Sequence, residues 1–183
     1  MFRGRAGARG LFHVVPAIHI GAMTAIITVR TATPADLAAV DALLARSYPR
    51  LLAADYPPSV IVTALPIIAR ARPELVQSGT YFVAETAEGA IIGAGGWTWG
   101  GSARGDVRHV VTDHRHLRRG VGRALMETAL ASAAAAGVEL MTCLSTRTAV
   151  PFYAALGFVT VGPVEVPLAP GIGFPAVRMQ RRM

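Results

Sequence analysis

The chain has 183 residues, of which 52% are hydrophobic and 16% are charged. This length suits one compact domain, and the composition excludes a disordered protein, which needs low hydrophobicity and high charge. The net charge of +7 rests on arginine alone, since no lysine occurs, and the single Cys143 excludes an internal disulfide and a multi-cysteine metal site.

Residues 1–22 differ in composition from the rest of the chain. Arginines precede an apolar stretch that is interrupted by His13, Pro16 and His19, as in a signal peptide, but the stretch is far shorter than the roughly 20 apolar residues of a membrane span. We predict a loosely ordered, basic and apolar extension over 1–22 and a single domain over 23–183. Met23 is then the natural start and the cytoplasm the expected location, with secretion as the alternative.

The first predicted elements are a strand and two helices. A short apolar run predicts a strand over 26–29, and Thr33, followed by proline and then by Asp36, is typical of a helix start. We expect this helix to end before Pro49. A second helical segment begins near Pro57, and Pro66 is expected to kink or divide it.

The remaining pattern alternates strands and helices. A hairpin is predicted over 80–99, followed by a loop over 100–105 and a strand over 106–112. A long alanine-rich helix from Gly120 to Gly137 comes next. The later predicted elements are a buried strand over 138–144, a helix over 148–156, a strand over 158–161, a proline- and glycine-rich tail over 163–175 and a final strand over 176–179. This order predicts a mixed α/β domain.

Two glycines, Gly120 and Gly122, lie where a strand leads into the long helix, with arginines around them. Unpaired amides at a helix start bind anions, and glycine lets a phosphate approach closely, so the segment 115–124 predicts a phosphorylated ligand. A Walker loop is excluded because it needs a lysine, and the dinucleotide fingerprint because it needs a third glycine. An arginine-rich turn before an ordinary helix is the plain alternative.

With this loop, a second segment completes a recognisable pair of motifs. Leu117-Arg118-Arg119-Gly120-Val121-Gly122 and Thr148-Ala149-Val150-Pro151-Phe152-Tyr153-Ala154-Ala155-Leu156-Gly157-Phe158 resemble the central motifs of the GNAT superfamily of acyl-CoA-dependent N-acetyltransferases. The resemblance covers residues 26 to about 180. It implies a mostly antiparallel sheet of about seven strands flanked by helices, whose fourth and fifth strands splay apart for acetyl-CoA, the acyl donor.

The resemblance also implies which residues hold the cofactor. By motif position these are Val110, Val111, Thr112, Leu117, Arg118, Arg119, Gly120, Val121, Gly122, Arg123, Thr148 and Phe152. Two of them depart from the family pattern. Leu117 stands where the family has arginine or glutamine, and Thr148 where it often has asparagine, so each of these side-chain contacts is altered.

Tyr153 matches the tyrosine that commonly protonates the leaving thiolate in this family, and a phenol with a pKa of about 10 is protonated at neutral pH. A tyrosine that merely packs in the core is the alternative. His109 is the candidate general base because its ordinary pKa suits the role, with Asp106, Glu85 and a base acting through water as rivals. Strand alternation is expected to put His109 and Val110 on opposite faces.

The resemblance implies N-acetylation of a primary amine, on a small molecule or a peptide, by direct attack in a ternary complex. It locates the acceptor between about Tyr48 and Tyr56 and in the loop over 167–174. A catalytically silent acyl-CoA-binding module is the alternative. We expect no nucleic-acid partner, because a solvated basic face explains the charge, no membrane partner and no metal; a homodimer stays open.

Overall fold

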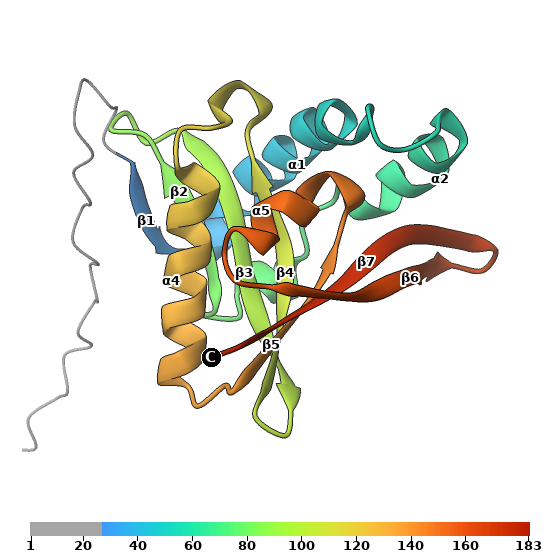
Figure 1. Ribbon diagram of the computed structural model, residues 1–183. Coiled ribbons are helices and arrows are strands. Elements are labelled where there is room, and N and C mark those ends of the chain that lie inside the picture. Colours follow the sequence, from blue (N-terminus) through green and yellow to red (C-terminus); the bar gives the residue numbers. More distant parts are fainter. Residues whose placement is uncertain (1–26) are drawn as a thin grey trace, which may run out of the picture.

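A seven-stranded sheet forms the centre of the molecule. The structure, a computed structural model, describes residues 27–183, so the predicted extension over 1–22 lies outside the described residues. The strand order is β1-β2-β3-β4-β5-β7-β6, and the pairing is antiparallel except between β4 and β5. The strands are β1 (Thr28–Thr31), β2 (Tyr81–Glu85), β3 (Ile91–Gly101), β4 (Arg104–Thr112), β5 (Leu140–Ser145), β6 (Val159–Ala169) and β7 (Ile172–Arg182). This confirms the predicted mixed, mostly antiparallel fold (Figure 1).

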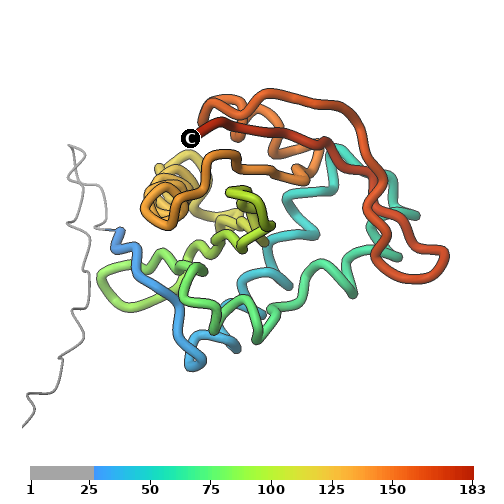
Figure 2. Tube along the Cα trace, turned by 90° about the horizontal axis from the view of Figure 1, so that it is seen from below, coloured from blue at the N-terminus to red at the C-terminus, as the bar shows by residue number. Residues whose placement is uncertain are grey.

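Helices cover both faces of this sheet. They are α1 (Leu37–Leu52), α2 (Pro58–Ile68), α3 (Pro73–Val76), α4 (Val121–Ala135) and α5 (Val150–Ala154). One hydrophobic core joins α4 and α5 to the sheet, and a second joins α1 and α3 to it. A third core lies between the α1–α2 region and the β6–β7 hairpin, and Figures 1 and 2 both show the hairpin beside α2.

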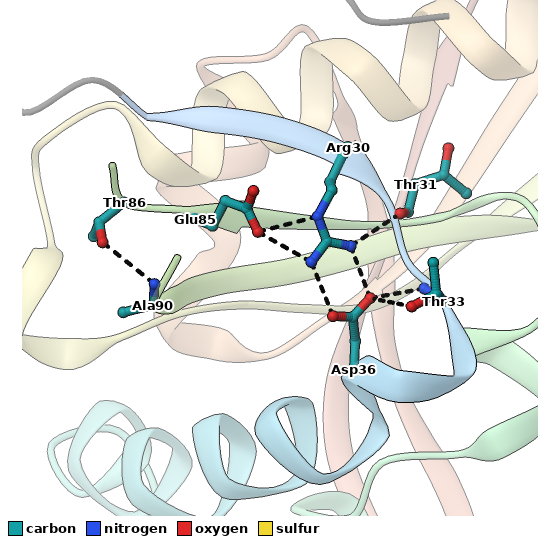
Figure 3. Close-up of polar contacts among 7 residues, drawn as sticks. All are labelled: Arg30, Thr31, Thr33, Asp36, Glu85, Thr86 and Ala90. Carbon is teal, nitrogen blue, oxygen red and sulfur yellow. Dashed lines mark hydrogen bonds and ion pairs between the residues drawn. The ribbon is translucent and has the colours of Figure 1, made fainter. Parts of the chain in front are cut away.

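Arg30 connects the edge strand β1 to the neighbouring strand β2 and to the turn before α1. The Arg30 guanidinium donates two hydrogen bonds to the Asp36 carboxylate, at 2.8 and 2.9 Å, and one to Glu85 at 3.0 Å (Figure 3). Asp36 also accepts from the Thr33 backbone N–H at 2.7 Å, which is the helix-start arrangement that the sequence predicts. Bonds to Arg30 outweigh burial and lower the pKa of Asp36 to about 2.

Both helical prolines behave differently from the prediction. Helix α1 runs through Pro49 to Leu52, and α2 runs undivided through Pro66. Each proline lies in or near the last turn, where it removes one backbone hydrogen bond without disturbing a long following segment. Burial of Leu52, which is 2% exposed, favours continuing α1 past its proline.

The structure also differs from the prediction at the loop over 100–105 and at the tail over 163–175. Residues 100–105 form a hairpin end, in which β3 and β4 are joined by Ser102 and Ala103 at φ values of 49° and 56°. The tail over 163–175 is most of the β6–β7 hairpin. Its strands accept prolines because β6 is an edge strand, and because Pro175 lies beyond the last residue that pairs with β5.

Within residues 27–183, no helix has both the length and the apolar character needed to cross a membrane.

Candidate active site

A cleft of about 970 Å³ opens where β4 and β5 part. The two strands pair in parallel only from Arg104 to Asp106 on β4, so the backbone groups of β4 beyond Asp106 that face β5 have no strand partner. Both strands line the cleft, together with the loop before α4, helix α5, the ends of α1 and α2, and the β6–β7 hairpin. The predicted splaying of the fourth and fifth strands is therefore confirmed.

A β-bulge shapes the middle of this cleft. Gly96 pairs with Arg108 and Ala94 with Val111, so His109 and Val110 together stand opposite the single residue Gly95. His109 has a φ of +45°. Both His109 and Val110 line the cleft, and the Val110 side chain also packs against the α4 core.

The neighbouring strand β3 has Gly95 opposite the bulge, where a side chain would clash with β4. A Cβ on Gly95 would lie 2.9 Å from the Val110 Cα atom, closer than side chains pack. The Tyr81 hydroxyl on β2 donates a hydrogen bond to the His109 carbonyl oxygen at 3.1 Å and stabilises the backbone of the bulge.

The predicted phosphate loop forms one end of the cleft. Arg118 and Gly120 both have positive φ, 62° and 81°, and α4 begins directly after them. Amides of a first helical turn lack intrahelical partners, so those after Gly120 are available to an anion. A Cβ on Gly122 would meet the Thr112 hydroxyl at 3.1 Å and the Phe152 ring at 3.3 Å, which explains the glycine there.

The structure brings nearly all predicted cofactor residues together. Those that line the cleft are Val110, Val111, Thr112, Leu117, Arg118, Gly120, Val121, Gly122, Arg123, Thr148 and Phe152. The exposed Arg119 is not among the lining residues. Thr148 donates to the Asp55 carboxylate at 2.6 Å, so its hydroxyl connects the turn before α5 to the segment between α1 and α2.

A buried carboxylate, which the sequence analysis did not single out, anchors the phosphate loop. Asp113 is fully buried at the end of β4 and accepts three hydrogen bonds from Arg115, from the backbone N–H, Nε and Nη2, at 2.8–3.0 Å. Arg46 on α1 donates a fourth at 2.9 Å. Bonds to Arg115 hold the pKa of Asp113 well below its usual range. The only sequence signal is an acid between a strand and an arginine-rich turn.

Tyr153 lies in the cleft wall on α5. Its ring packs edge-on against Phe152 and Phe158, at centroid distances of 5.1 and 5.4 Å. Burial raises the pKa of its hydroxyl well above the usual value, and Cys143 on β5 adds to this shift. Burial raises the pKa of the Cys143 thiol to about 12, so the thiol is protonated at neutral pH.

His109 is neutral at pH 7 in this setting. Burial, followed by the charges of Arg72 and Arg108, lowers the pKa of its imidazole to about 4. Its Nδ1 atom is shielded from solvent and has no hydrogen-bond partner among residues 27–183. A neutral imidazole has one ring nitrogen that accepts a hydrogen bond, and the His109 residue lines the cleft.

Neither of the rival bases Glu85 and Asp106 lies at the cleft. Glu85 is bound to Arg30, and Asp106 contacts Arg108 at 3.4 Å. His116 lines the cleft and His114 does not. The described part of the chain contains no group of three or more histidine, cysteine and acidic residues that could hold a metal ion.

Comparison with known proteins agrees with this geometry. A family model described as an acetyltransferase (GNAT) domain matches residues 52–182. The chain belongs to the GNAT acetyltransferase family. A GNAT-type acetyltransferase uses acetyl-CoA as its acyl donor, which fits a cleft with a phosphate loop at one end. A comparison with curated protein sequences found no match.

Solved structures of GNAT proteins share the fold. A GCN5-related N-acetyltransferase from Rhodopseudomonas palustris is 22% identical, with a TM-score of 0.69, over 90% of this chain and 99% of that one. Rv2747 from Mycobacterium tuberculosis, in complex with CoA and NLQ, is 21% identical (TM-score 0.61; 85% and 99% covered). The PaiA N-acetyltransferase from Thermoplasma acidophilum, in complex with coenzyme A, is 14% identical (TM-score 0.63; 86% and 99% covered).

Proposed function

We propose that the protein transfers the acetyl group of acetyl-CoA to a primary amine by direct attack in a ternary complex. The observation that carries this proposal is the single cleft that joins the phosphate loop, the bulge of β4 and Tyr153. A cofactor held by its diphosphate at Arg118–Arg123 has its pantetheine arm beside the unpaired backbone of β4. Its thioester then lies near the bulge.

The proposed reaction forms one bond and breaks one. The nitrogen of a neutral amine attacks the thioester carbonyl carbon, the new C–N bond forms, and the C–S bond breaks. The carbonyl oxygen carries negative charge on the way, and backbone N–H groups at the bulge are suited to stabilise it. The amine loses one proton, and the thiolate gains one to leave as CoA thiol.

Tyr153 is the proposed proton donor and His109 the proposed first proton acceptor. The raised pKa of Tyr153 keeps its hydroxyl protonated at neutral pH, as a donor requires. With a pKa of about 4, His109 is a weak base, so it orients the amine by accepting a hydrogen bond and passes the proton on to water. Direct attack is favoured over an acyl-enzyme because the only cysteine is a protonated, buried thiol.

The substitution Tyr153→Phe tests this proposal. It removes one hydroxyl and keeps the ring packing, so we expect kcat to fall by about 10²–10⁴-fold, the range of general acid catalysis, with the Kd for acetyl-CoA unchanged. Thiol release measures kcat, and calorimetry measures the Kd for acetyl-CoA. Unchanged kcat in a stably folded variant would refute the role of Tyr153. Cofactor binding without transfer to any amine would favour the catalytically silent module.

A further inference from the structure

The part of the cleft away from the phosphate loop has an apolar wall. Every side chain that α1, α2, β6 and β7 contribute to the cleft is apolar except Tyr48. Among them are Leu51, Ile67, Ile68, Val166, Leu168 and Phe174. Such a wall offers no partner to hydroxyl or ammonium groups, and burying them there without hydrogen bonds is costly. It therefore suits an aliphatic or aromatic group.

This wall is held firmly in place. Tyr56 stacks on Phe174 at a centroid distance of 4.8 Å and donates a hydrogen bond to the Pro175 carbonyl oxygen at 2.9 Å. The Tyr56 hydroxyl also accepts from the Arg147 backbone N–H at 2.8 Å. Tyr56, in the segment between α1 and α2, thus contacts both the β6–β7 hairpin and the turn before α5. These contacts hold the apolar wall in place, so the wall is preformed.

Two arginines stand at the other side of the acceptor region, next to the bulge. Arg108 directly precedes His109; its Nε donates to the Thr98 hydroxyl at 2.8 Å, and its contact with Asp106 is 3.4 Å long. Arg72 is 4.0 Å from Glu74, too far for a hydrogen bond. Both arginines line the cleft, and among residues 27–183 Glu74 is the only acidic residue that lines it with them; Asp106, which pairs with Arg108, does not line it. An anion is the fitting ligand.

We infer that the acceptor is a small α-amino acid with an apolar side chain, whose carboxylate binds Arg72 and Arg108 and whose side chain contacts the apolar wall. An α-carbon carries amine, carboxylate and side chain one bond apart, and His109, the two arginines and the apolar wall all line this one cleft. The inference rests on the proposed function. The products are the N-acetyl amino acid and CoA thiol.

Acceptor selectivity tests the inference. Thiol release at saturating acetyl-CoA is measured with L-leucine, L-alanine, L-serine and L-leucinamide. We expect kcat/KM for leucine to exceed that for alanine by roughly 50-fold, because leucine buries three further carbons. It should exceed that for leucinamide, which lacks the carboxylate, by about ten-fold or more, the factor of one charge-assisted hydrogen bond. Equal rates for leucine and leucinamide would overturn the carboxylate site.

Two arginine variants and a control identify the residues. Arg72→Gln and Arg108→Gln should each lower the leucine-to-leucinamide ratio several-fold, chiefly by raising the KM for leucine. Arg70→Gln is the matched control, because Arg70 is exposed, contacts Asp41 at 3.3 Å and does not line this cleft; it should keep the ratio of the wild type. Ratios unaltered in both cleft variants would overturn the assignment.

A binding measurement separates this inference from the proposed function. Calorimetry of the CoA-loaded protein with N-acetyl-L-leucine reads the pocket without turnover. Binding without any acetyl transfer would support the pocket and contradict the transferase. Transfer that favours serine, a polyamine or a peptide amino terminus over leucine would overturn the amino-acid inference and leave the transferase standing. If N-acetyl-L-leucine does not bind and L-leucine is not acetylated, the inference is also overturned.

Discussion

We expect Asp113→Asn to destabilise the protein and to weaken cofactor binding at the same time. The carboxylate is fully buried and accepts four hydrogen bonds, three from Arg115 and one from Arg46. An asparagine of the same shape loses the charge and turns one acceptor into a donor that faces arginine donors. The start of the phosphate loop then loses its anchor on β4.

The structure sets the size of this effect. Each hydrogen bond to a charged group contributes about 1.5–3 kcal/mol. The Arg115 side chain is 62% exposed and regains water when its partner is lost, so its share is reduced. About 3 kcal/mol is a fair sum, the lower end of the cost of breaking a buried pair. For a domain of this size it corresponds to a Tm about 6–12 °C lower.

Thermal unfolding followed by circular dichroism measures this change, and calorimetry with CoA measures the affinity. Glu127→Gln serves as control, because the exposed Arg123–Glu127 pair is 3.4 Å long and spans one helical turn. Such a pair contributes only about 0.3–0.5 kcal/mol. A Tm loss for Asp113→Asn no larger than that of the control would refute the anchoring role.

Two further predictions concern pH and the cofactor. The lowered pKa of Asp36, about 2, means that its ion pair with Arg30 stabilises the fold above the unfolded pKa near 4 by about 2 kcal/mol, a contribution lost as the pH falls through 2. The difference in urea midpoint between the wild type and Asp36→Asn should therefore vanish near pH 2. Gly122→Val should weaken CoA binding at least about ten-fold, because its side chain enters space already filled from β4 and α5. Gly162→Val, which meets open space, should bind CoA as the wild type does in the same titration.

Local signals were sufficient to predict many residues that line the cleft. The spacing of Gly120 and Gly122 after a strand marks a helix start that binds anions, and this chemistry depends on neighbouring residues only. The order of strands and helices follows from hydrophobic periodicity in the same way. Most cofactor residues predicted from the motifs accordingly line one cleft.

Features that depend on distant residues were not predictable. Nothing in residue type marks a histidine in a strand for positive φ, so the bulge at His109 was missed. The helix through Pro49 depends on the burial of Leu52. The β6–β7 hairpin depends on the edge position of β6 and on the end of the β5–β7 pairing before Pro175. The contacts of Asp113 with Arg46 and of Asp55 with Thr148 join residues 67 and 93 positions apart.

The extra residue in β4 also bears on how that strand serves two hydrophobic cores. In a regular strand, residues four apart face the same way. Here Val107 packs in the α4 core and Val111 in the α1 core. Between these two residues β4 has one residue more than β3, and this extra residue puts the two valines on opposite faces. Deleting His109 or Val110 would leave Val107 and Val111 three residues apart, and a regular strand places such residues on opposite faces, so each would stay in its own core. Both cores thus accept this strand with or without the extra residue, and its loss would alter only the backbone that lines the cleft.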